Sequence, residues 1–195
     1  MYIDRLKEVN MFQLLDIAKG FLNQAKIEPD GILVDFTMGN GHDTLYLCSL
    51  VPCGTVYAFD IQEQALINTK TRLDEAGVTS DVVLIKDSHS NAKEYINGEI
   101  NGGMFNLGYR PGGDKNVHTM HESTLCAVKD AVNMLKKGGV LVISVYPGHE
   151  EGKIEGEMLL DFLSQYDKKL YSVSRFHLVN SFDAPFVIAV ERYDK

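Results

Sequence analysis

The sequence predicts a doubly wound α/β domain, an open and mostly parallel sheet with helices on both faces. Short apolar runs alternate along the chain with longer amphipathic segments, as expected when strands and helices alternate. The first run ends in Asp35 and leads through a turn with two glycines, Gly39 and Gly41, into a helical segment. The last two runs predict a β-hairpin. The chain of 195 residues can bury one full core, so residues 1–195 are expected to form a single domain.

The composition excludes several classes of protein. Hydrophobic residues make up 45% of the chain, as in ordinary globular proteins, and no apolar run is long enough to cross a bilayer. The first residues lack the apolar core of a signal peptide, so a cytoplasmic protein is expected. The formal net charge of −8 opposes non-specific binding to nucleic acid, although a local basic patch could still hold an RNA.

The cysteines argue against a disulfide framework and against a cysteine-rich zinc site. The three residues, Cys48, Cys53 and Cys126, are odd in number and form no C-x-x-C pair. Buried or inert thiols are therefore the better interpretation.

The first half of the chain is expected to supply four strands and the helices between them. Apolar residues three and four positions apart predict a helix over residues 4–26, within an N-terminal segment, 1–30, that packs on the domain. The tripeptide Pro29-Asp30-Gly31 ends this helix. The strands are expected at residues 32–35, 55–59, 81–85 and 103–105, and the helices between them at 42–50, 62–75 and 91–96.

The second half is expected to supply a long helix, a buried strand, another helix and the hairpin. The helix spans residues 118–136 and is closed by two lysines and two glycines at 136–139, since cations and glycine are favoured at helix ends. The continuous apolar run 140–145 is typical of a strand covered on both faces. A helix at 156–166 and strands at 171–178 and 186–191 complete the chain.

Polar residues follow the first four predicted strands. In open α/β sheets ligands bind at the carboxyl ends of the strands, so this convergence predicts a binding site. Glycine in the first loop permits positive φ, and the helix after it offers free N–H groups to an anion. Asp60 follows the second strand and could accept both hydroxyls of a ribose; the alternative is a solvated strand end. Asp87 and Ser88 follow the third strand and could face an adenine ring, or could simply form a turn.

The first loop also bears on the kind of cofactor. The dinucleotide fingerprint G-x-G-x-x-G would need a third glycine where Thr44 stands, which disfavours a nicotinamide cofactor. S-adenosylmethionine (SAM) has no pyrophosphate, but its carboxylate can use the loop N–H groups. Its sulfonium and ammonium groups suit the nearby carboxylates of Asp35 and Asp43, although Asp43 could equally be a residue favoured at a helix start by the dipole.

The loop after the fourth strand predicts a transfer site. It reads Asn106-Leu107-Gly108-Tyr109-Arg110-Pro111-Gly112-Gly113-Asp114-Lys115, and its glycines and proline indicate a demanding backbone geometry. An asparagine at a strand end can accept the hydrogens of an amine while the aromatic ring packs on the target base. The arrangement is similar to the N-P-P-Y motif of amino-group methyltransferases, with Leu107-Gly108 where that motif has prolines.

The two motifs together, T-M-G-N-G-H-D-T at 37–44 and N-L-G-Y-R-P-G-G-D at 106–114, resemble the family labelled "putative rRNA methylase". Members of that family are understood to be tRNA methyltransferases that methylate 5-aminomethyl-2-thiouridine at the wobble position. The resemblance implies a seven-stranded sheet with the last strand inserted antiparallel beside the fifth, SAM as cofactor, and the anticodon arm of tRNA as partner. Two residues depart from the family, Met38 and Arg110, and Arg110 could add an RNA contact.

The resemblance also assigns roles to single residues. Those expected to bind the cofactor are Asp35, Gly39, Asn40, Gly41, His42, Asp43, Thr44, Asp60, Ile61, Asp87, Ser88 and Asn106. Those expected to line the transfer site are Asn106, Leu107 and Tyr109, with Gly108 and His149 expected to contact the substrate. Apart from the resemblance, Arg110, Lys115, His118 and His121 lie close together in sequence around this loop and could contact RNA; the alternative is that they are solvated side chains. Asp114, His118 and His149 are the candidates to accept a proton. His118 and His121 could be metal ligands, but nothing completes a set, so no metal is expected.

Other functions stay open at this stage. A methyltransferase acting on rRNA or on a small amine would use the same cofactor loop. A nicotinamide-dependent oxidoreductase and a non-catalytic SAM-binding protein are the remaining alternatives. A homodimer could form through the apolar first helix or the terminal hairpin.

Overall fold

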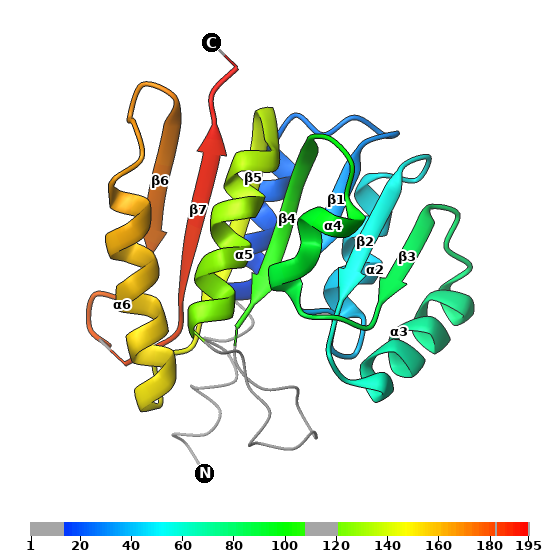
Figure 1. Ribbon diagram of the computed structural model, residues 1–195, viewed down its shortest axis with the longest axis horizontal. Coiled ribbons are helices and arrows are strands. Elements are labelled where there is room, and N and C mark those ends of the chain that lie inside the picture. Colours follow the sequence, from blue (N-terminus) through cyan, green and yellow to red (C-terminus); the bar gives the residue numbers. More distant parts are fainter. Residues whose placement is uncertain (1–13, 108–120, 182, 195) are drawn as a thin grey trace.

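One seven-stranded sheet forms the centre of the protein, with helices on both faces (Figure 1). The computed structural model describes residues 14–107, 121–181 and 183–194. The strand order is β3-β2-β1-β4-β5-β7-β6. Strands β1 to β5 are parallel, whereas β7 runs antiparallel to β5 and β6 antiparallel to β7. The predicted fold class is confirmed, including the insertion of the last strand beside the fifth.

The elements follow the predicted order. In chain order they are a helix of residues 14–24, β1 (Ile32–Asp35), α2 (His42–Leu50), β2 (Thr55–Phe59), α3 (Glu63–Ala76), β3 (Asp81–Ile85), the 3₁₀ turn η1 (His89–Asn91), α4 (Ala92–Tyr95), β4 (Ile100–Asn106), α5 (His121–Met134), β5 (Leu135–Val145), α6 (Glu150–Ser164), β6 (Tyr171–Phe176) and β7 (Phe186–Arg192).

Two boundaries differ from the sequence prediction by five residues or more, the start of β5 and the start of α6. The glycines at 138–139 do not close a helix, because α5 ends at Met134 and β5 begins at Leu135. Gly138 takes a φ of +78° inside β5, and the register of β4 and β5 shifts between Ile100 and Gly102. This irregular pairing starts the strand five residues early.

Helix α6 also begins earlier than predicted, at Glu150 instead of residue 156. The ring of His149 accepts a hydrogen bond from the Gly152 N–H at 3.0 Å and so caps the helix. Gly152 lies in the first turn of α6. A residue with a Cβ atom would not fit there, because the Cβ would collide with the backbone oxygen of Tyr146. Glycine has a low helix propensity, so Gly152 predicts locally that the helix begins after it. The close packing against Tyr146 explains why glycine stands inside the helix.

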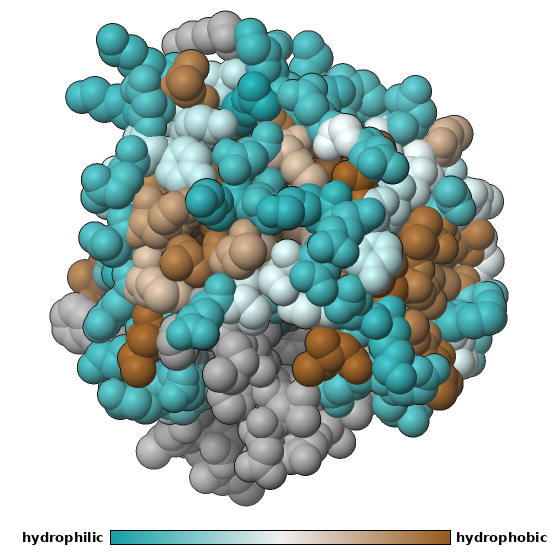
Figure 2. Space-filling model, in the orientation of Figure 1, coloured by the Kyte–Doolittle hydropathy of each residue, from teal (hydrophilic) through white to brown (hydrophobic). Residues whose placement is uncertain are grey.

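Two hydrophobic cores lie on the two faces of the sheet. One is built with α4, α5 and α6, and the other with α2, α3 and the helix of residues 14–24. Strands β4, β5 and β7 are buried along most of their length. Figure 2 shows one face as mostly hydrophilic, with hydrophobic side chains gathered toward the two edges of the sheet.

Within the described ranges, no helix combines the length and hydropathy needed to span a bilayer. The three cysteines are free thiols, Cys48 being buried and Cys53 and Cys126 exposed. Burial raises the pKa of the Cys48 thiol to about 11, which makes that thiol inert at neutral pH.

Candidate active site

The glycine loop after β1 adopts the conformation that the sequence predicts. Gly39 and Gly41 have φ values of +51° and +78°, which residues other than glycine rarely adopt. A Cβ on Gly41 would stand 2.8 Å from the Cα atom of Thr69 in α3. Glycine is thus required both by the turn and by the close approach of α3. The Leu45 N–H donates to the Gly41 oxygen at 3.0 Å, so α2 begins directly after the loop.

Asp60 connects the end of β2 to the glycine loop. Its Oδ2 accepts a hydrogen bond from the Gly39 N–H at 3.1 Å, and its Oδ1 accepts one from the Gln62 N–H at 2.9 Å. The side chain is half-buried, and an ionised carboxylate accepts hydrogen bonds from N–H and O–H donors. Beside it Ile61 is 55% exposed, which leaves an apolar surface at the carboxyl end of β2. This geometry fits a ribose and the ring attached to it.

Asp35 lies under the loop and is 1% exposed. Its Oδ2 accepts from the Thr44 hydroxyl at 2.6 Å, and its Oδ1 accepts from the Thr37 N–H at 3.1 Å. Burial, followed by the charge of Asp43, raises the pKa of Asp35 to about 7. The Thr44 side chain is fully buried, and its hydroxyl holds Asp35 in place. Its place among the cofactor-binding residues stays a prediction.

The raised pKa of Asp35 predicts a pH-dependent stability without cofactor. An unfolded aspartate has a pKa of about 4, so unfolding releases a proton between about pH 4 and pH 7. The free energy of unfolding should fall over this window and lose on the order of 2 kcal/mol between about pH 5.5 and pH 8. Urea denaturation of the wild type and of Asp35→Asn at both pH values tests this. Equal losses in both proteins would contradict it.

Helix α3 supports the loop from outside. Arg72 Nε donates to the Asn40 oxygen at 2.7 Å, and Asn68 Nδ2 donates to Asn40 Oδ1 at 2.9 Å. Arg72 Nη2 lies 3.1 Å from Nε2 of His42, which must accept. Desolvation and then the charge of Arg72 lower the pKa of His42, so its ring is neutral. Asn68 and Arg72 are absent from the sequence predictions, because only packing brings them to the loop.

The turn after β3 is held by Asp87. The carboxylate accepts hydrogen bonds from the Tyr95 hydroxyl at 2.8 Å, from Asn91 Nδ2 at 3.1 Å and from the Ser88 N–H at 2.7 Å. These three donors, Tyr95 first, lower the pKa of Asp87. Ser88 caps η1 by accepting from the Ser90 N–H. These contacts are those of a turn, which was one of the two predictions for Asp87 and Ser88. The other, a contact with an adenine ring, stays a prediction.

His89 lies next to this turn and is buried, at 9% exposure. Its Nδ1 donates to the Phe36 oxygen at 3.1 Å. Burial lowers the pKa of His89 to about 4, and the ring is neutral at physiological pH. The residue therefore ties the loop after β1 to the turn after β3.

Asn106 ends β4 next to the glycine loop. Its backbone N–H donates to Thr37 Oγ1 at 2.7 Å, and its Nδ2 donates to Asp43 Oδ2 at 3.2 Å. The rings of Phe36 and Phe105 stack at 4.1 Å and fix the two strand ends together. The structure thus brings the predicted transfer residue and the predicted cofactor loop into direct contact.

Leu107, by contrast, is 1% exposed and packs in the core with residues of α5. A substrate contact by this residue stays a prediction. His149 is exposed and caps α6, as described above. Tyr146 follows β5; burial, followed by the charge of Asp43, raises the pKa of Tyr146 to about 12. Sequence reasoning gave no signal for this tyrosine.

Several predicted residues fall outside the described ranges. They are Gly108, Tyr109, Arg110, Asp114, Lys115 and His118, together with the side chain of His121. Across the described ranges, no group of three or more histidines, cysteines or acidic residues is placed to hold a metal ion.

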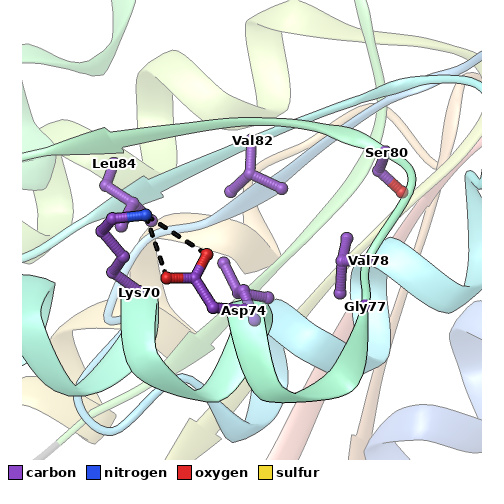
Figure 3. A pocket seen from close by; sticks show the side chains of 8 residues that line it. Lys70, Asp74, Gly77, Val78, Ser80, Val82 and Leu84 are labelled. Carbon is purple, nitrogen blue, oxygen red and sulfur yellow. Dashed lines mark hydrogen bonds and ion pairs between the residues drawn. The ribbon is translucent and has the colours of Figure 1, made fainter.

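A cavity of about 540 Å³ lies apart from this site, between α3 and β3 (Figure 3). It is lined by Lys70, Leu73, Asp74, Gly77, Val78, Ser80, Val82 and Leu84. All of these belong to α3, β3 or the turn between them, and Lys70 pairs with Asp74 at 3.0 Å. None comes from the loops after β1, β2 or β4, so the site at the carboxyl ends remains the candidate active site.

Comparison with known proteins gives the family. The family model described as "Putative rRNA methylase" matches residues 56–191. The chain is 35% identical over 173 residues to the chloroplastic tRNA (mnm(5)s(2)U34)-methyltransferase of Arabidopsis thaliana, and the match covers 83% of this chain and 63% of that protein. The chain therefore spans less than two thirds of that relative.

Two solved structures are similar over nearly their whole length. The "putative rRNA-methylase" from Clostridium thermocellum is 36% identical with a TM-score of 0.87, over 92% of this chain and 97% of that one. A "putative methyltransferase" from Streptococcus mutans, solved in complex with SAH, is 36% identical with a TM-score of 0.83, over the same shares. Taken with the family model, these matches establish that the chain belongs to the "Putative rRNA methylase" family.

Proposed function

We propose that the protein N-methylates the aminomethyl group of 5-aminomethyl-2-thiouridine at the wobble position of tRNA, giving 5-methylaminomethyl-2-thiouridine, and that it acts in the cytoplasm. The observation that carries the proposal is Asn106, held at the end of β4 beside the glycine loop. The name of the Arabidopsis relative supports the substrate. The motif at 106–114 supports amino-group chemistry, since an asparagine there can accept the hydrogens of an amine.

The cofactor is SAM, because a relative of 36% identity was solved with SAH, the molecule that remains after SAM gives up its methyl group. The residues of the site fit SAM. The glycine loop offers N–H groups to the carboxylate, Asp60 offers acceptors to the ribose hydroxyls, and Ile61 offers apolar surface to the adenine. Asp35 places a buried carboxylate near the positive groups. When bound, the cofactor supplies an electrophilic methyl group.

The protein contributes mainly by positioning. The oxygen of Asn106 accepts an N–H of the substrate amine and aims the nitrogen lone pair at the methyl group. The amine must be neutral to attack, so the rate should rise with pH up to the pKa of the bound amine. Tyr109 is proposed to pack on the base and Asp114 to take the proton released after transfer. Gly108, Arg110, Lys115, His118, His121 and His149 are proposed to contact the anticodon arm.

A transfer assay with labelled SAM tests the substrate class. Three acceptors are compared: tRNA from cells lacking this gene, tRNA from cells that cannot make the aminomethyl group, and rRNA from the first cells. We expect label in the first acceptor alone. Label in rRNA would support the second candidate function, an rRNA methyltransferase, which the description of the family model favours. Label only in small amines would remove RNA from the proposal.

We also propose a homodimer formed through the terminal hairpin. β6 is an edge strand of the sheet (Figure 1), and Val173 and Phe176 on it are 36% and 41% exposed. Leu170 and Val179, which flank it, are 54% and 81% exposed. An uncovered apolar edge of this kind favours pairing with a second strand.

The dimer predicts a specific response to mutation. Val173→Lys combined with Phe176→Lys should convert a dimer to a monomer in light scattering after gel filtration, because two charges would enter the paired edge. The matched control is Ile67→Lys, at a side chain 51% exposed on α3, which should stay dimeric. A monomeric wild type would contradict the proposal.

A further inference from the structure

Asp43 connects the glycine loop, the N-terminal helix and the end of β4. It lies in the first turn of α2, and its side chain is 12% exposed. Its Oδ2 accepts from Asn106 Nδ2 at 3.2 Å, and its Oδ1 lies 3.7 Å from Lys19 Nζ. Lys19 is itself held over the ring of Tyr46, at 4.9 Å from the centroid. Both the lysine and the helix N-terminus favour a negative charge at this position.

The contact with Asp43 decides which way the amide of Asn106 faces. An ionised carboxylate can only accept hydrogen bonds, whereas an amide has a donor end and an acceptor end. Asn106 must therefore present its Nδ2 to Asp43, and its Oδ1 points away. With a neutral partner either end of the amide could face inward, and an inward-facing oxygen would leave N–H groups toward an amine that needs an acceptor.

The other contacts of Asn106 within the described part of the chain fix its backbone and do not involve its amide. The N–H of Asn106 donates to Thr37 Oγ1 at 2.7 Å, and Phe105 beside it stacks on Phe36. Neither contact involves the side-chain amide. The orientation of that amide thus depends on Asp43.

We propose that Asp43 is a positioning residue: it sets the amide of Asn106 with its oxygen toward the substrate amine. This inference rests on the proposed function, because it concerns the acceptor that the amine meets. It differs from the sequence-based expectation that Asp43 binds the cofactor. On the present contacts the carboxylate acts through Asn106, and its loss should change the rate of transfer far more than the affinity for SAM.

Exchanging the side chains of Asp43 and Asn106, singly and together, tests the inference. In Asn106→Asp two carboxylates face each other, so kcat should fall about 100-fold or more. In Asp43→Asn, which alters one atom, the orientation of the amide is no longer determined, and kcat should fall about tenfold. In the double variant the new asparagine donates to the new aspartate, whose second oxygen faces the amine. Its kcat should exceed that of Asn106→Asp by about tenfold.

Binding of SAM, measured by calorimetry in all four proteins, confirms folding and separates the roles. Dissociation constants within about fivefold of wild type are expected. A double variant that binds SAM but is no faster than Asn106→Asp would overturn the inference. So would a loss of SAM affinity in Asp43→Asn as large as its loss of kcat. If the wild type itself leaves aminomethyl tRNA unmethylated, the proposed function fails. If the wild type is active but the double variant is no faster than Asn106→Asp, only the positioning role of Asp43 fails.

Discussion

Replacement of Asn106 by alanine is expected to lower kcat by about two to three orders of magnitude and to leave the SAM dissociation constant within about threefold. In the proposed function the side chain offers the acceptor that orients the amine, whereas the backbone N–H of residue 106 keeps its contact with Thr37 in the variant. Because this interaction is made with the amine and not with the cofactor, its loss should lower kcat and leave the SAM dissociation constant unchanged. Single-turnover transfer to tRNA and calorimetry with SAM measure the two quantities.

The matched control for this variant is Asn133→Ala, at an exposed asparagine on α5. This variant should keep the kcat and the SAM affinity of the wild type. It also removes a side-chain amide, but at the end of α5 that lies away from the carboxyl ends of the strands. Full activity in Asn106→Ala would show that the amine is held by other groups and would remove the transfer role of Asn106.

Replacement of Asp60 by alanine is expected to weaken SAM binding about 100-fold, close to 2.7 kcal/mol. The variant loses the acceptor proposed for the ribose hydroxyls, and it also loses the hydrogen bond that connects the Gly39 N–H to the end of β2. Both effects act on the cofactor, so the loss should appear in the dissociation constant measured by calorimetry. Asp60→Asn keeps one oxygen acceptor and should lose less.

Asp74→Ala is the control for Asp60, because Asp74 is an exposed aspartate on α3 that pairs with Lys70 at the rim of the distant cavity. Its affinity for SAM should match that of the wild type. An Asp60→Ala protein with unchanged affinity would exclude ribose binding and return Asp60 to a solvated strand end.

The parts of the site that the sequence predicted are those with local signals. Positive φ at Gly39 and Gly41 follows from the glycines themselves, and the strand before them follows from its apolar run. The position of Asp60 beside the loop follows from the parallel order of β1 and β2, because carboxyl ends of parallel strands share one edge. Each inference needed only neighbouring residues and the rule of alternating elements.

The parts that the sequence did not predict depend on packing between distant segments. Leu107 is adjacent to Asn106, yet it turns into the core, and a polar loop sequence gives no sign of that turn. Arg72 reaches Asn40 only because α3 crosses the loop, and His89 is buried because the turn after β3 folds onto Phe36. Such contacts are set by tertiary structure, which local periodicity does not encode.

The most direct test of the proposed reaction locates the transferred methyl group. tRNA from cells lacking this gene is incubated with the protein and SAM, digested to nucleosides and analysed by fragmentation mass spectrometry. The account predicts one added methyl group on the side-chain nitrogen of 5-aminomethyl-2-thiouridine, with loss of the unmethylated nucleoside and no other change. A methyl group on any other atom, or an unchanged aminomethyl nucleoside in the presence of bound SAM, would contradict it.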